Sequence, residues 1–225
     1  MAWSDYNLAM TSPVRQRAAI VIADAAGFAQ SILADEAGTG DRFKELADEI
    51  FKPLLKQYRG RLIGDQGGAF LMTFTSAVAA VNFTIDVQRT LPVHQSQWPE
   101  NQRLRFRIGV NLGDIIVEGD QAHGAGVDIT SQMQKLAEPG GLVISKGIFD
   151  QAHRRLDHVA FEDLGPQGGE NTSDPTTAYR ILLDTSVVRD PAGVRSWFSG
   201  RRIAFVVFMA IILGAAALWK LQPWR

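Results

Sequence analysis

Cysteine is absent from the 225-residue chain, which excludes a disulfide framework, a thiolate nucleophile and thiolate metal ligands. An excess of either charge is also absent, because 23 lysines and arginines stand against 24 aspartates and glutamates, for a net charge of −1. A nucleic-acid partner would require a basic excess on some face, so we expect no nucleic-acid binding. The four histidines do not follow the spacing of a zinc site, and we expect surface or loop positions for them.

A long charge-free run is present near the C-terminus, at residues 203–219. As a helix it would extend about 25 Å, near the short end of what spans a bilayer. Arg201, Arg202 and Lys220 flank the run, and tryptophans lie near both ends, which is typical of a membrane span. We predict a transmembrane helix here; the alternative is a helix buried in a core or against a partner.

The organisation of the rest of the chain follows from this run. The N-terminal residues are polar, with no cationic start followed by an apolar core, so we expect no secretory signal. Basic residues precede the apolar run, which favours a cytosolic globular part. The predicted segments are an N-terminal segment 1–16, a globular domain 17–185, a linker 186–202, the transmembrane helix 203–219 and a short tail 220–225.

The apolar periodicity of the globular part predicts a mixed α+β domain around one mostly antiparallel sheet. The predicted strands are 18–23, 61–63, 69–75, 106–112, 115–118, 142–145, 159–162 and 177–182. The predicted helices are 41–57, 77–91, 128–137 and 146–156. Ser76 is expected to cap the second helix, and Pro53 to kink the first helix or end it early. The glycine-rich segment Gly64–Gly68 is expected to form a hairpin turn.

Several segments together resemble one family. They are Ile22–Phe28, Phe106–Asp120, Leu136–Ser145 and Phe161–Gly165, followed by Pro175 and by Tyr179 with Arg180. The sequence from Arg17 to Leu182 resembles the class III nucleotide cyclase catalytic domain in its bacterial adenylate/guanylate cyclase form. The resemblance implies a ferredoxin-like sheet with helices on one face. It also implies a head-to-tail dimer with active sites at the dimer interface.

The resemblance further implies a reaction and a set of residue roles. The ribose 3′-hydroxyl attacks the α-phosphate and pyrophosphate leaves, with two Mg²⁺ or Mn²⁺ ions bridged by two aspartates. An arginine stabilises charge on the phosphorus oxygens, an asparagine positions the ribose, and a lysine with a second polar residue reads the purine.

The two metal positions fall on Asp24 and Gly68. Asp24 matches the first metal aspartate, and its alternative interpretation is a helix N-cap. Gly68 stands where the second aspartate is expected, so the second carboxylate is missing. Asp65 would replace it only if the hairpin slipped register; otherwise Asp65 is an ordinary turn residue.

The remaining positions also depart from the pattern. Gly64 stands at the base-reading lysine, and Gln121 at the second purine-reading position. Asp128 replaces the ribose-positioning asparagine, and Gln132 replaces the transition-state arginine. We interpret Asp128 as the N-cap of its helix, because a carboxylate beside a triphosphate adds repulsion.

Two hypotheses follow. The first is an inactive cyclase-like domain that serves as a regulatory, binding or structural subunit of a membrane assembly and needs no cofactor. The second is an active adenylate or guanylate cyclase with a rearranged site of Asp24, Asp65 and Gln121 and with Mg²⁺ or Mn²⁺.

The expected partners follow from the predicted anchor and from the family. They are another membrane protein or complex, or a second cyclase domain in a homodimer or heterodimer. The small residues Gly214–Ala217 would let another transmembrane helix approach closely. A bacterial inner membrane is the expected location.

Overall fold

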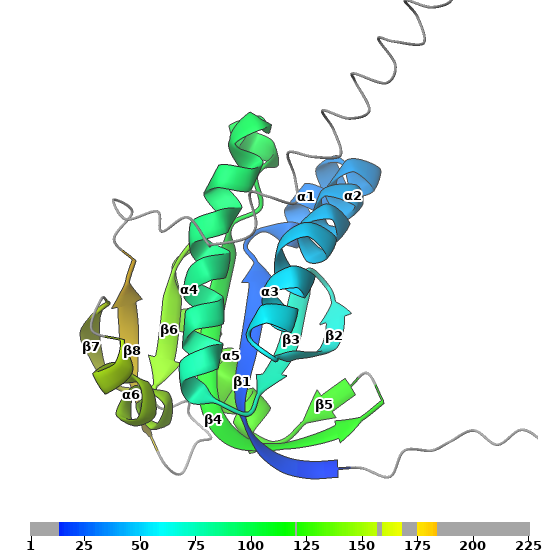
Figure 1. Ribbon diagram of the computed structural model, residues 1–225. Coiled ribbons are helices and arrows are strands. Elements are labelled where there is room, and N and C mark those ends of the chain that lie inside the picture. The colour runs from blue at the N-terminus through cyan, green and yellow to red at the C-terminus, as the bar shows by residue number, and fades with distance from the viewer. Residues whose placement is uncertain (1–13, 120, 157–158, 168–174, 184–225) are drawn as a thin grey trace, which may run out of the picture. The chain divides into compact units, whose positions relative to one another are not determined.

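The computed structural model describes residues 14–119, 121–156, 159–167 and 175–183 (Figure 1). The chain divides into two units, Met1–Thr185 and Ser186–Arg225, and all the described residues belong to the first. Within them, no helix has both the length and the apolar character needed to cross a membrane. The predicted linker, the predicted transmembrane helix and the small residues Gly214–Ala217 lie outside the described residues.

One sheet contains all the described strands. They are β1 (Val14–Ala25), β2 (Arg61–Gln66), β3 (Ala69–Phe74), β4 (Phe106–Glu118), β5 (Gln121–His123), β6 (Leu142–Ser145), β7 (Ala160–Gln167) and β8 (Thr176–Leu182). The strand order is β2-β3-β1-β4-β6-β8-β7, and β5 pairs with β4 outside this path. Only the β4–β6 pair is parallel among these strands, which confirms the predicted mostly antiparallel sheet. The two strands predicted within 106–118 are one continuous strand, β4.

Helices connect the strands and cover the sheet. They are α1 (Phe28–Ala34), α2 (Glu36–Leu46), the π-helical η1 (Ala47–Phe51), α3 (Lys52–Gln57), α4 (Ala77–His94), α5 (Ala125–Leu136) and α6 (Lys146–Ala152), with short 3₁₀ turns η2 (Gln95–Gln97), η3 (Glu100–Gln102) and η4 (His153–Arg155). Ser76 caps α4 as predicted, because its Oγ accepts a hydrogen bond from the backbone N–H of Ala79 at 3.3 Å.

The helices lie on both faces of the sheet, which corrects the expectation of helices on one face. Side chains of β1 alternate, so that Val21 enters the large core beneath α2–α4 and Ile20 enters a second cluster on the opposite face. Helix α5 lies on that opposite face, behind the sheet in Figure 1. Glycine allows its close approach: a Cβ at Gly109 would lie 2.3 Å from the backbone nitrogen of Gln134.

The helical segment around Pro53 does not end early, because α3 continues to Gln57, but its regular α-helical geometry is interrupted directly before the proline. The path continues from α2 through η1 into α3, and the N–H of Lys52 bonds to the carbonyl of Ala47, five residues earlier. In a regular helix the Pro53 ring would clash with the carbonyl four residues before it. The wider π turn directly before Pro53 accommodates the proline ring, so that the helix continues into α3.

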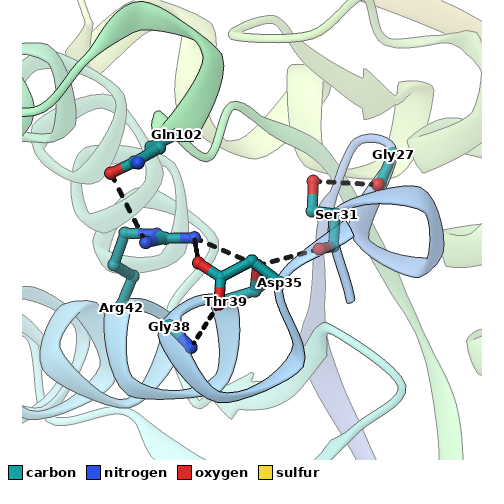
Figure 2. Close-up of polar contacts among 7 residues, drawn as sticks. All are labelled: Gly27, Ser31, Asp35, Gly38, Thr39, Arg42 and Gln102. Atoms are coloured by element: carbon teal, nitrogen blue, oxygen red, sulfur yellow. Dashed lines mark hydrogen bonds and ion pairs between the residues drawn. The ribbon is translucent and has the colours of Figure 1, made fainter. Parts of the chain in front are cut away.

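Asp35 fixes the corner between α1 and α2 (Figure 2). Its carboxylate accepts a bond from the N–H of Gly38 at 3.0 Å and pairs with the guanidinium of Arg42 at 3.1 Å. The backbone hydrogen bond, and then the Arg42 contact, lower the pKa of Asp35. Arg42 also donates to Thr39 and to Gln102, so that the corner is held to the loop before β4.

Candidate nucleotide groove and metal position

The structure brings positions 24 and 68 together at one end of the sheet. Asp24 is near the end of β1 and lies opposite Ala69 of β3. The N–H of Ala25 donates to the carbonyl of Gly68 at 2.9 Å. These are the positions that the resemblance assigns to the two metal carboxylates, and one of the two residues here has no side chain.

The turn that contains Gly68 is shorter than predicted. Strand β2 continues to Gln66, so only Gly67 and Gly68 connect the strands, with φ of 62° and 85°. Two consecutive positive φ angles are typical of a tight hairpin turn and favour glycine at both positions.

Phe28 occupies the space that a side chain at position 68 would need. A Cβ added to Gly68 would lie 2.3 Å from Cγ of Phe28 and 2.7 Å from its Cβ. Because these atoms are close to the Phe28 backbone, they have little freedom to move aside. A carboxylate at position 68 is therefore opposed by both backbone conformation and packing.

Asp24 is held by a cation and an amide of its own chain. Its Oδ2 accepts bonds from Nη2 of Arg107 at 2.6 Å and from Nε2 of Gln134 at 3.1 Å. The side chains of Asp24 and Arg107 are 26% and 34% exposed, so the pair is only partly screened by water. The N-cap interpretation of Asp24 is wrong: the N-cap of α1 is Gly27, and no side chain caps this helix.

Arg107 and Gln134 were not among the residues singled out in the sequence. Arg107 lies directly opposite Asp24 in the antiparallel β1–β4 register, which places the two side chains on the same face. The strand prediction for 106–112 did not indicate this contact, because only the register shows which residue Arg107 faces.

Asp65 lies on the other face of the sheet from Asp24. It is a strand residue opposite Phe70, which is buried in the core beneath the helices, so its interpretation as a turn residue is wrong. It is close enough to α3 to contribute to the raised pKa of Lys52, whose main cause is the hydrogen bond to Asp48. This placement gives no support to Asp65 as a substitute metal ligand.

The residues at this position do not fit the metal pair that the family resemblance implies. Two bridged divalent ions need at least two carboxylates at one place. Of the two positions, among the described residues, only Asp24 supplies a carboxylate, and the Arg107 guanidinium lies 2.6 Å from it. We therefore derive no catalytic step through such ions.

A groove of about 380 Å³ lies on the face of the sheet that carries Asp24, and it brings Gly64 and Gln121 together. Its lining residues are Ile22, Gly64, Ala69, Phe70, Leu71, Gln121 and Ala122. The Gln121 amide is the one polar side chain in this set, and Gly64 offers space rather than a donor. The groove is therefore suited to a flat, mostly apolar group with one hydrogen-bonding edge.

Asp128 and Gln132 lie on α5 and are not among the described residues that line the groove. Helix α5 starts at Ala125, three residues earlier than predicted, and Gly124 is its N-cap. Asp128 is consequently not the N-cap; it is an exposed residue of the first turn, where its charge is favourable to the helix dipole.

Known structures share this architecture. The crystal structure of an adenylate/guanylate cyclase/hydrolase from Silicibacter pomeroyi is 27% identical, with a TM-score of 0.67 over 76% of this chain and 99% of that chain. The adenylyl cyclase CyaB from P. aeruginosa is 20% identical, with a TM-score of 0.64 over 76% of this chain and 96% of that chain. This chain carries a class III adenylate/guanylate cyclase homology domain.

The curated relatives of the cyclase homology domain are much longer proteins. Putative adenylate cyclase 3 of Rhizobium meliloti is 35% identical over 168 residues, which are 75% of this chain and 28% of that protein. The serine/threonine-protein kinase pkn2 of Myxococcus xanthus is 23% identical over 96% of this chain and 29% of that protein. The chain thus spans little more than a quarter of the length of either relative. No protein-family model matches it.

Proposed function

We propose that the cyclase homology domain is catalytically inactive and acts as a regulatory, binding or structural module. The observation that carries the proposal is the pair of positions 24 and 68, where Gly68 supplies no carboxylate and Asp24 is bound to Arg107. A metal pair would have to displace Arg107 and would then find only one of the two bridging carboxylates.

The other positions add to this argument. Gln132 stands at the position of the arginine that would stabilise the transition state. Loss of such a cation reduces phosphoryl-transfer rates by about 10³-fold or more. Asp128 adds negative charge where a triphosphate needs attraction. In a dimer of the family type, each active site combines one set of these functional positions from each of the two chains. Both sets contain altered residues here, so pairing with a complete partner would not restore an intact site.

Binding without catalysis is supported by the groove. Its volume and apolar lining fit a planar ring, and Gln121 can both donate and accept a hydrogen bond. We infer that the domain pairs with a second cyclase domain or responds to a ligand in this groove.

A membrane location is part of the same proposal. The support is the charge-free run 203–219 with its basic and tryptophan-containing flanks. In cells, we expect the full chain to stay with the membrane after carbonate extraction and a variant ending at residue 200 to be released. Release of the full chain would contradict the anchor.

The alternative is an active adenylate or guanylate cyclase, and the names of the similar proteins favour it. Purified full chain incubated with ATP or GTP and with Mg²⁺ or Mn²⁺ distinguishes the two. We expect no cyclic nucleotide above the background of an Asp24→Ala variant. Robust turnover that Asp24→Ala abolishes would contradict the proposal and establish the alternative.

A further inference from the structure

Three potential metal ligands meet in the layer of α2, η1 and α4, which covers the face of the sheet opposite the groove. Glu45 is on α2, Glu49 is on η1, and His94 is the last residue of α4. The Nε2 atom of His94 lies 3.2 Å from Oε1 of Glu45 and 3.7 Å from Oε2 of Glu49. All three donor atoms lie within 4.8 Å of one another.

The two separations from His94 match those of ligands around one small cation. Zinc binds histidine nitrogen and carboxylate oxygen at about 2.0–2.2 Å, so two ligands of a tetrahedral site are about 3.4 Å apart. The two His94 distances fall on either side of this value.

Helix geometry and packing bring the three ligands together before any ion arrives. Glu45 and Glu49 are four residues apart on one continuous helical path, which places them on the same face. The His94 side chain is only 18% exposed, and its ring packs edge-on against Trp98 with ring centroids 6.0 Å apart. Little freedom of the His94 side chain is therefore lost on binding.

The site is open on one side. The Glu45 side chain is 42% exposed, so that an ion can enter and water can complete its coordination. The two carboxylates carry negative charge that a divalent cation would neutralise, and the imidazole supplies a nitrogen ligand. One nitrogen and two oxygen ligands suit first-row transition metals better than Mg²⁺ or Ca²⁺.

We propose that Glu45, Glu49 and His94 form a binding site for a divalent transition metal, with Zn²⁺ as the best match. The site is separate from the groove and does not depend on whether the domain is an active cyclase. The competing explanation is a protonated His94 that forms an ion pair with the two glutamates and binds no metal.

The test uses the untagged full chain, freed of metal and titrated with Zn²⁺ by calorimetry. We expect one Zn²⁺ per chain at this site, with an affinity at least about tenfold lower in Glu49→Gln and in His94→Gln. Asp48→Asn is the matched control, because Asp48 is a neighbouring carboxylate that pairs with Lys52 and is not part of the cluster. Asp48→Asn and Asp24→Asn should leave the affinity unchanged.

Nuclear magnetic resonance of the unaltered chain gives a second readout that requires no variant to fold. Saturating Zn²⁺ should shift the ring ¹⁵N resonance of His94 Nε2 and leave that of His153 unchanged. An unmoved His94 resonance, or Zn²⁺ binding that is the same in His94→Gln, would overturn the proposal and leave the ion pair as the explanation.

Discussion

Asp24 keeps the position of the first metal carboxylate, yet its partners are Arg107 and Gln134 instead of a second carboxylate. The Arg107 contact neutralises Asp24 within the folded chain and joins β4 to β1, while the Gln134 hydrogen bond joins α5 to β1. At the scale of single residues, the interactions of Asp24 are therefore those of a structural ion pair.

The ion pair should contribute measurably to stability. We expect Arg107→Ala to lower the free energy of unfolding in urea by about 1–2 kcal/mol, because it leaves the half-buried Asp24 without its cation. In a double-mutant cycle with Asp24→Ala, the coupling energy should be about 1 kcal/mol.

The exposed cross-strand pair Arg15–Asp114 is the matched control for this cycle, since its side chains are 74% and 52% exposed. Its coupling energy should stay below about 0.5 kcal/mol. Equal coupling in the two pairs would contradict a special role for Arg107.

Gly68 allows a comparison with its neighbour Gly67. Both have positive φ, but a Cβ at Gly67 would meet no atom within 4 Å, whereas one at Gly68 would meet Phe28. We expect Gly67→Asp to lower the free energy of unfolding by about 1 kcal/mol through the backbone alone, and Gly68→Asp by a further 1–3 kcal/mol or so.

Urea unfolding of the two variants measures this difference. If Gly68→Asp is no more destabilising than Gly67→Asp, Phe28 moves aside easily and packing does not oppose a second carboxylate.

At the scale of elements, the sequence predicted what depends on local periodicity. The alternation in Phe106–Leu112 and the apolar stripe after Ser76 identified β4 and α4, because each pattern reports burial on one side. The placement of α5 was missed. It depends on Gly109 and Gly126, whose contacts are between elements far apart in the sequence.

Close packing of α5 should depend on Gly109. A Cβ at Gly109 would lie 2.3 Å from the Gln134 backbone nitrogen and 2.5 Å from the Thr130 carbonyl oxygen. We expect Gly109→Ala to lower the free energy of unfolding by about 1–3 kcal/mol and to weaken the Gln134–Asp24 hydrogen bond. Urea unfolding measures the first effect, and solvent exchange of the Gln134 side-chain amide protons measures the second.

Gly40→Ala is the control for Gly109→Ala, because Gly40 is in α2 with no atom within 4 Å of an added Cβ. It should raise the free energy of unfolding by up to about 1 kcal/mol through helix propensity. A Gly109→Ala variant as stable as the unaltered chain would show that α5 can shift at little cost.

At the scale of the whole molecule, the sequence predicted the fold class and which site positions depart from the family pattern. It could not predict the face on which Asp65 lies, because this depends on the register shift between Leu62 and Gly64 in the β2–β3 pair. Nor could it predict the Asp24–Arg107 contact or the meeting of Glu45, Glu49 and His94, which all require the tertiary structure.

The most direct test of the central claim is the number of divalent ions bound beside Asp24. Electron paramagnetic resonance of the His94→Gln chain with Mn²⁺ and a non-hydrolysable ATP or GTP analogue would detect a coupled pair of ions, which in two-metal sites lie about 3.5–4 Å apart. We expect no coupled pair, because Gly68 supplies no ligand and Arg107 holds Asp24. A coupled Mn²⁺ pair that disappears in an added Asp24→Asn substitution would contradict the account.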